Sequence, residues 1–329
     1  SGWAAMEKKD YTTAVNEFQQ VIDQNSRLAE SYRAEGIAYY SEKAYPEAIA
    51  AFSRSLNNMD DPDKEFKKDV QFYLAQARMD YGEVDKAIEV YSEILKAGED
   101  EQAFFLRGKA YISMEDYKNA EKDFQRALEG CEDYNLYINI YQIYVDHNKA
   151  VDGDAYLKMA LELEPQDGED CYHRGRIYEY EKNYEAARDE LKTAMEQGYE
   201  DAMLLLGRVY LEMEDPASAR SMYQEYLQKS EQGAKAYNGL AMCDIYDGAY
   251  DSALENIAQG LKENSKEDEQ GLLYNEIVAY EYKRDFATAK EKMKIYLEQY
   301  PEDTELLDDV IIENKQAIEM TMIYRDIIN

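Results

Sequence analysis

One pattern of hydrophobic and polar positions recurs along the chain. An acidic or polar residue precedes an aromatic residue, an alanine follows after two or three residues, and an aromatic or large apolar residue comes after three more. The pattern first appears as DYTTAVNEF and returns as AYPEAIAAF, EVDKAIEVY, DYKNAEKDF, KAVDGDAYL (a weaker copy), NYEAARDEL, DPASARSMY, AYDSALENI and DFATAKEKM. Apolar residues three and four positions apart are typical of one face of a helix, so each copy predicts a helix.

The copies are regularly spaced, and a second apolar segment precedes each of the clearest ones. Their aromatic-equivalent positions run from Tyr11 to Phe286 with a mean period of about 34 residues. The preceding segments read YRAEGIAY, FFLRGKAY, CYHRGRIY, MLLLGRVY and YNGLAMCD. We expect a single solenoid of nine helix pairs with approximate limits at 1–28, 29–62, 68–100, 101–133, 134–167, 168–199, 200–233, 234–267 and 270–303, followed by a capping helix at 304–328.

These segments resemble the tetratricopeptide repeat family. Small residues match the family's two positions of close helix approach: Gly36, Gly108, Gly175 and Gly207 in the first helix, and Ala48, Ala87, Ala120, Ala187, Ala219, Ala253 and Ala289 in the second. Pro165 and Pro301 match the proline that ends a repeat. The resemblance implies an all-α fold, a right-handed α-α superhelix. The acidic, tyrosine-rich composition also resembles tetratricopeptide lipoproteins and scaffolds of anaerobic Gram-positive bacteria.

Two copies depart from the pattern. The step from Tyr45 to Val84 is 39 residues, so extra residues are expected in the connection NNMDDPDKEF or in a longer helix after it. The fifth copy has Gly153 where alanine is usual, which predicts a weaker second helix.

The resemblance also implies a binding surface, because the first helix of each repeat lines the inner face in this family. Its register predicts a peptide-binding groove formed by Phe72, Phe105, Lys109, Tyr172, Arg176, Leu204, Arg208, Asn238 and Tyr274. Three of these residues, Lys109, Arg176 and Arg208, are cations at equivalent positions in an acidic chain. Such a row suits an extended peptide with carboxylates or a free C terminus, since arginine offers paired donors. The alternative is ion pairing between repeats, for example with Glu179 or Asp201.

Charge and composition narrow the classes of function. A formal charge of −33 disfavours nucleic acid as a partner, and no apolar run approaches the length that crosses a bilayer. The chain has two histidines, His147 and His173, and no nucleophile, phosphate-binding or metal-binding motif. We therefore expect no enzymatic activity, no cofactor and no metal.

The sequence thus favours a non-enzymatic scaffold that binds a protein or an extended peptide. The alternative is a structural or assembly component of a bacterial cell envelope, and a third reading is an accessory subunit that regulates an enzyme. Because the chain begins with SGWAAMEKK, a removed leader is expected, with a lipid anchor outside the given sequence and an extracytoplasmic or cell-surface location. A cytoplasmic location is the alternative.

Overall fold

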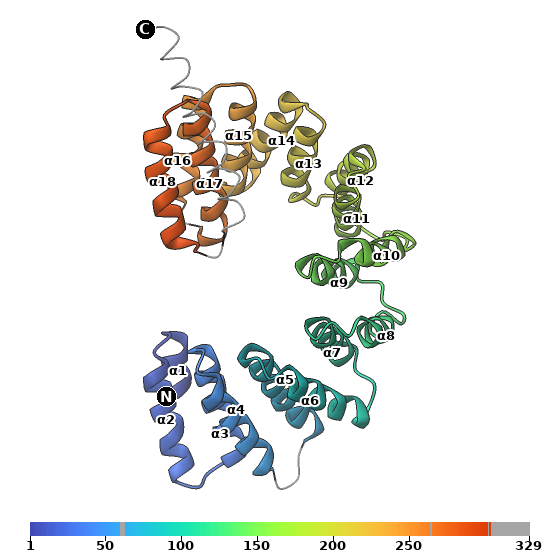
Figure 1. Cartoon of the computed structure of the whole chain (residues 1–329), viewed down its shortest axis with the longest axis vertical. Coiled ribbons are helices and arrows are strands. Elements are labelled where there is room, and N and C mark those ends of the chain that lie inside the picture. The colour runs from blue at the N-terminus through green and yellow to red at the C-terminus, as the bar shows by residue number, and fades with distance from the viewer. Residues whose placement is uncertain (60–62, 264, 302, 304–329) are drawn as a thin grey trace. The chain divides into compact units, whose positions relative to one another are not determined.

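Helices joined by short turns follow one another along the chain in the computed structural model (Figure 1). The structure describes residues 1–59, 63–263, 265–301 and 303. These residues form eighteen helices and no strand, arranged as consecutive packed pairs. The predicted all-α solenoid of helix pairs is thereby confirmed, whereas the predicted cap at 304–328 lies outside the described residues.

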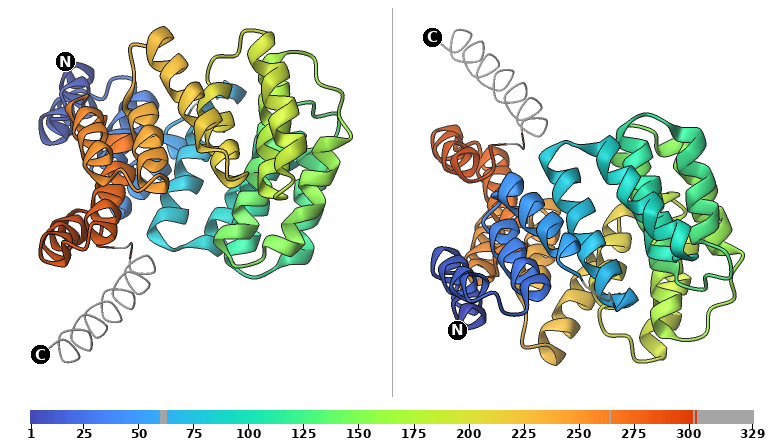
Figure 2. Two further views of the ribbon diagram at one scale, coloured as in Figure 1. Left: turned by 90° about the horizontal axis from the view of Figure 1, so that it is seen from above. Right: turned by 90° about the horizontal axis from the view of Figure 1, so that it is seen from below.

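The chain divides into two compact units, residues 1–163 and 164–329. The first unit contains α1 Gly2–Glu7, α2 Tyr11–Asp23, α3 Leu28–Ser41, α4 Tyr45–Asn57, α5 Lys64–Tyr81, α6 Val84–Ala97, α7 Glu101–Ser113, α8 Tyr117–Ala127, α9 Tyr134–Asp146 and α10 Ala150–Leu161. The second contains α11 Gly168–Tyr180, α12 Tyr184–Glu196, α13 Ala202–Glu212, α14 Pro216–Lys229, α15 Ala234–Tyr246, α16 Tyr250–Lys262, α17 Lys266–Tyr282 and α18 Phe286–Gln299. Figure 2 shows the helix pairs of each unit from two further sides. One continuous solenoid over 1–329 stays a prediction.

The polar residue that opens the nine-residue pattern has a structural role as the N-cap of the second helix. The Asp10 side chain accepts a hydrogen bond from the Thr13 N–H at 3.1 Å, and Asp116 accepts one from Asn119 at 3.2 Å. Asn183, Asp215 and Asp285 cap α12, α14 and α18 in the same way. Each cap satisfies a backbone N–H that the helix itself leaves without a partner. The opening residue is the N-cap of every second helix, but in the other four copies (Ala44, Glu83, Lys149 and Ala249) its side chain makes no capping hydrogen bond.

The glycines of the first helices allow an aromatic or large apolar side chain of the second helix to lie against the backbone. A Cβ atom on Gly108 would lie 2.6 Å from Cε1 of Phe124, and one on Gly36 would lie 2.6 Å from Cε1 of Phe52. Both rings are fully buried. The small residues that the sequence aligned are thus the points at which the two helices of a hairpin meet.

The extra residues of the third pair lengthen its first helix. Helix α5 has 18 residues, whereas α3 has 14. In the fifth pair, a Cβ on Gly153 would lie 3.0 Å from the Tyr144 Cβ, so glycine occupies another close approach between helices. Helix α10 nevertheless runs for 12 residues.

Ion pairs between residues sixteen positions apart join the two helices of several hairpins. Arg107 of α7 pairs with Asp123 of α8, and Arg174 of α11 donates from Nε to Glu190 of α12 at 2.8 Å. The last described hairpin reverses the charges, because Lys292 of α18 lies 2.8 Å from a carboxylate oxygen of Glu276 in α17. In the third hairpin the corresponding positions hold the buried apolar residues Leu74 and Val90.

Candidate functional site

Within each unit, the first helices of neighbouring hairpins approach one another more closely than the second helices do. Helix α3 contacts α5, α7 contacts α9, and α11, α13, α15 and α17 contact in order, whereas neighbouring second helices of the described chain make only weaker contacts. A stack whose first helices are closer together curves toward them. The first helices therefore line the inner side of each unit, and all the predicted groove residues belong to first helices.

On the inner side of the second unit, Tyr172 and Arg176 of α11 form a stacked pair. The Arg176 guanidinium lies 5.9 Å from the centroid of the Tyr172 ring, within the range of a cation–π contact. Its Nη1 atom is 3.4 Å from Nδ1 of the buried His173. The Tyr172 ring also packs against Tyr199, with ring centroids 4.9 Å apart. Among the described residues, no carboxylate lies within ion-pair distance of Arg176.

The hydroxyl of Tyr172 lies in a field of several charges. Burial raises the pKa of Tyr172, and Asp201 raises it further. Arg176, Arg208 and Lys235 act in the opposite direction and lower it. These three cations come from α11, α13 and α15, so successive first helices bring positive charge to one place on an acidic protein.

Arg208 differs from Arg176 because it is already paired. It donates to Glu179 of α11 from Nε to Oε1 at 2.5 Å and from Nη2 to Oε2 at 2.6 Å. The Arg208 side chain is 55% exposed and that of Glu179 is 14% exposed. Arg208 thus follows the alternative that the sequence left open, ion pairing between repeats. Arg176 has no such ion pair with the part of the chain that the structure describes.

The other predicted residues of the second unit lie along the same side and also take part in packing. Leu204 is half-buried against the core around Met203 and Tyr223. Asn238 accepts a hydrogen bond at its Oδ1 from Nδ2 of Asn275 at 2.8 Å, which joins α15 to α17. Tyr274 packs against the cluster that contains Met293 and Tyr296.

In the first unit, Phe72 and Phe105 are partly buried and Lys109 is exposed. Phe72 lies 6.4 Å from the Tyr91 ring, and Phe105 lies 6.2 Å from the Phe124 ring. Lys109 forms no ion pair with the described residues. Because Lys109 belongs to the first unit and the two arginines belong to the second, the predicted row of three cations is divided between the units.

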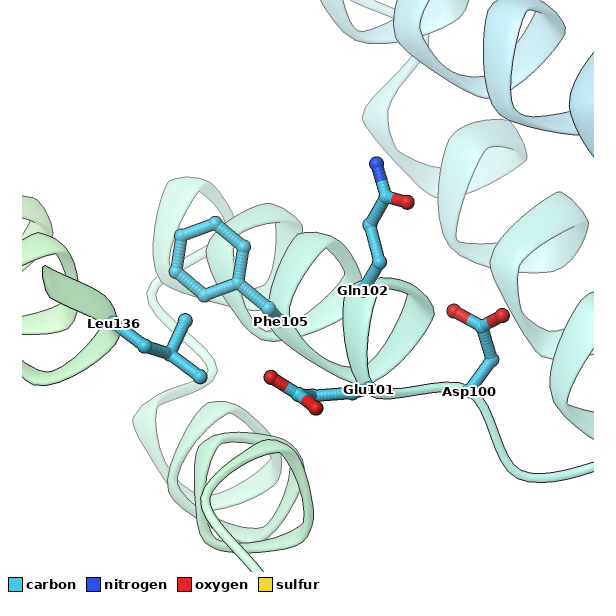
Figure 3. Close-up of a pocket in the computed structure, with 5 residues that line it drawn as sticks. All are labelled: Asp100, Glu101, Gln102, Phe105 and Leu136. Carbon is cyan, nitrogen blue, oxygen red and sulfur yellow. The ribbon is translucent and has the colours of Figure 1, made fainter. Parts of the chain in front are cut away.

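A pocket opens beside Phe105 at the start of α7 (Figure 3). Its volume is about 430 Å³, and it is lined by Asp100, Glu101, Gln102, Phe105 and Leu136. Leu136 comes from α9, so two neighbouring first helices form the pocket. The sequence register identified Phe105 but not Glu101 or Leu136, which lie off the expected strip.

Trp3 is an exposed aromatic residue of the first helix α1 that the sequence register did not include. Gly2 lies twelve residues before Ala14, the same spacing as between Gly36 and Ala48. In the structure, a Cβ atom on Gly2 would lie 2.5 Å from Cε1 of Phe18. The residue after this glycine is Trp3, which is 48% exposed. The glycine-to-alanine spacing is the signal that would have placed it.

Comparison with known families identifies these repeats. The Tetratricopeptide repeat model matches residues 1–63, 172–234 and 204–269, and a second model of the same description matches residues 101–133. The matched segments together make up more than half of the chain. The chain belongs to the tetratricopeptide repeat family. Tetratricopeptide repeat proteins are generally non-catalytic scaffolds.

Several solved structures are similar to this tetratricopeptide repeat protein. A tetratricopeptide repeat protein from Parabacteroides merdae is 12% identical, with a TM-score of 0.49 and coverage of 77% of this chain and 100% of that one. The C-terminal part of a TPR repeat-containing protein from Cytophaga hutchinsonii is 16% identical, with a TM-score of 0.45 and coverage of 73% and 98%. YrrB, described as a TPR protein with an unusual peptide-binding site, is 26% identical, with a TM-score of 0.36 and coverage of 56% and 96%. No curated protein matches the chain.

In the described ranges, no three His, Cys, Asp or Glu side chains are grouped so that they could hold a metal ion. No helix of that part of the chain has both the length and the apolar character needed to cross a bilayer.

Proposed function

We propose that this protein is a non-enzymatic scaffold that binds an extended peptide segment of a partner protein on the inner side of its first helices. In the second unit, the central contact of this proposal is Arg176, which recognises a carboxylate of that segment. The observation that carries the proposal is the guanidinium of Arg176, held over the Tyr172 ring with no carboxylate partner among the described residues.

The chemistry around Arg176 suits a carboxylate. The Tyr172 ring restricts the arginine side chain, so less conformational entropy is lost when a ligand binds. Lys235 and Arg208 also lower the pKa of the Tyr172 hydroxyl, although Arg208 is paired with Glu179 and Nζ of Lys235 lies 3.9 Å from Asp268. A carboxylate placed between the Tyr172 hydroxyl and Arg176 would accept hydrogen bonds from both groups, and such charge-assisted bonds are among the strongest in proteins.

The residues beyond Arg176 supply contacts for the rest of a peptide. Leu204 offers a half-buried apolar surface, and Tyr274 offers part of an aromatic ring. Asn238 uses its Oδ1 atom for Asn275, so its amide N–H groups can donate to a peptide carbonyl. Side chains on a rigid stack of helices would therefore choose the partner.

A display library of random dodecapeptides, selected on the purified full chain, tests this proposal. We expect selected peptides to carry aspartate, glutamate or a free C terminus, and Arg176→Glu to weaken their binding by at least about tenfold. Arg176→Glu combined with Arg208→Glu should abolish capture without loss of helicity in circular dichroism. Arg284→Glu is the matched control, because Arg284 is exposed in the turn between α17 and α18. If the selected acidic or free-C-terminus peptides bind the double variant as well as the wild type, the proposal is refuted.

The proposals of an envelope role and a cell-surface location rest on the acidic, tyrosine-rich composition, which resembles that of tetratricopeptide lipoproteins. A lipobox cysteine directly upstream of Ser1 in the full-length gene, together with recovery of the native protein in the detergent phase of a Triton X-114 extraction, would support them. A gene that continues upstream as further repeats would argue against an anchor at that point. The reading as an accessory subunit of an enzyme would require co-purification with a catalytic partner.

A further inference from the structure

We infer that the pocket beside Phe105 is a second peptide-binding site, and that it takes a basic side chain, lysine or arginine, from an extended segment. The inference goes beyond the carboxylate-binding role of Arg176, because this pocket belongs to the first unit and has the opposite charge preference. Two observations carry it: the apolar surface of the pocket and the unpaired carboxylate beside it.

The apolar part of the pocket consists of Phe105 and Leu136, from α7 and α9. The Phe105 ring is partly buried and contacts Phe124, so its position is fixed by the core. Long basic side chains lay their methylene stems along such surfaces and keep the charged group at the polar edge. A guanidinium or ammonium group can also lie over the face of the ring.

The polar edge of the pocket has one carboxylate left for a ligand. Asp100 caps α7, where its side chain accepts from the Ala103 N–H at 2.9 Å, and it lies 3.3 Å from Nζ of Lys68. Glu101 has neither a hydrogen bond nor an ion pair with any described residue. Figure 3 shows its carboxylate beside Leu136 and below the Phe105 ring.

The nearby cations are already neutralised. Lys68 also lies 3.1 Å from Glu65, and Arg126 pairs with both Glu99 and Glu129. Lys109 is one helical turn beyond Phe105, away from the start of α7 at which the pocket opens.

Carboxylates on the α9 side add to the negative field. Burial raises the pKa of Cys131, and the charges of Glu101, Asp133 and Glu132 raise it further, so these acids act on the same region. The pocket therefore combines an apolar surface with uncompensated negative charge, which complements a lysine or arginine side chain.

The volume fits this occupant. A pocket of about 430 Å³ is at the small end of the range of ligand sites in proteins. It accommodates one long side chain with its backbone. Gln102 also lines the polar edge of the pocket. Its side-chain amide can accept hydrogen bonds from, and donate them to, the peptide groups on either side of the basic residue.

Selection of the same dodecapeptide library on the full chain tests the inference, followed by fluorescence anisotropy of labelled peptides. We expect a class of peptides that carry arginine or lysine and bind about tenfold more weakly to Glu101→Gln and to Phe105→Ala. Replacing the arginine of the peptide by the uncharged citrulline should cause a similar loss with the wild-type protein. Binding should also weaken as the salt concentration rises.

The controls separate this site from the Arg176 site. Glu89→Gln makes the same charge change on the exposed face of α6 and should leave binding unchanged. Arg176→Glu should leave the basic peptides bound. If peptides that depend on Arg176 are found but none depends on Glu101, the inference about the pocket is wrong and the proposed function stands. Acidic peptides that depend on Phe105 would also overturn it.

Discussion

Arg107 donates two hydrogen bonds to the carboxylate of Asp123 across the hairpin of α7 and α8, at 2.7 Å from Nε and 2.8 Å from Nη2. A third bond runs from its Nη1 to Oγ of Ser92 at 2.9 Å, which ties this hairpin to α6. The Asp123 side chain is 7% exposed and that of Arg107 is 19% exposed. The pair occupies positions that Leu74 and Val90 occupy in the hairpin before it.

Removing only one partner of the Arg107–Asp123 pair should lower the free energy of unfolding more than replacing both partners by apolar residues. Arg107→Leu alone leaves a buried carboxylate without its partner, and we expect the free energy of unfolding to fall by about 3 kcal/mol. Arg107→Leu with Asp123→Val copies the apolar version of the preceding hairpin and should recover most of that loss. Urea denaturation followed by circular dichroism measures both. A double variant less stable than Arg107→Leu would contradict this account.

The pair between Arg208 and Glu179 should contribute to stability more than to capture of a partner. Arg208→Ala leaves the half-buried Glu179 carboxylate without its two donors, and we expect a loss of about 1–2 kcal/mol. A double-mutant cycle with Glu179→Gln measures the interaction between the two residues. Peptides selected on the inner side of the second unit should lose less affinity with Arg208→Ala than with Arg176→Ala. The reverse order would show that Arg208 leaves Glu179 to bind the ligand.

The close approach at Gly108 predicts an effect of a single methyl group. In Gly108→Ala, the new Cβ would lie 2.6 Å from the Phe124 ring, which is fully buried and cannot move away. We expect a loss of about 1–3 kcal/mol, although alanine is the better helix former. Gly98→Ala is the control, because a Cβ there meets nothing within 4 Å. Thermal denaturation that shows equal midpoints for the two variants would contradict the packing argument.

The buried carboxyl group of Glu35 should destabilise the folded first unit when it is charged, at neutral pH, and not when it is protonated, in acid. It is buried in α3, and burial raises its pKa above the ordinary 4.5, with Arg54 lowering it and Asp23 raising it. The folded protein therefore binds the proton of the Glu35 carboxyl group more tightly than the unfolded chain does. The stabilisation from this proton is fully present below about pH 4.5, and it is lost as the pH rises through the pKa that Glu35 has in the folded protein.

The variant Glu35→Gln tests this expected direction of the pH dependence. The uncharged variant should be about 1–2 kcal/mol more stable than the wild type at pH 7, and the difference should shrink toward pH 4. Glu42→Gln, at the exposed end of the same helix, should show no such trend. A Glu35→Gln protein that is less stable than the wild type at pH 7 would mean that the carboxylate is stabilised in its charged form.

Much of the fold could be predicted from the sequence because its signals are local. An aspartate or asparagine that opens a copy is a side-chain N-cap, as Asp10 and Asp116 show, and the aligned glycines are points of close approach. Spacing alone locates such features. The sixteen-residue ion pairs could also have been found from spacing, since both partners lie at fixed positions of one hairpin.

The binding surface was less predictable because it depends on contacts between hairpins. The pair between Arg208 and Glu179 joins α13 to α11, so it depends on how these two hairpins stack. The pocket beside Phe105 depends on how α9 places Leu136 against α7. Neither relationship is encoded in the sequence of a single repeat.

The reversed pair of Glu276 and Lys292 has a consequence for assembly of the chain. Hairpins of similar sequence can exchange helices during folding, either within one molecule or between two. If α17 packed on α12, Glu276 would face Glu190, and if α7 packed on α18, Arg107 would face Lys292. Each wrong partner would place two like charges in a half-buried interface. The reversed charges therefore oppose exchange of α17 or α18 with the helices of the α7–α8 and α11–α12 hairpins.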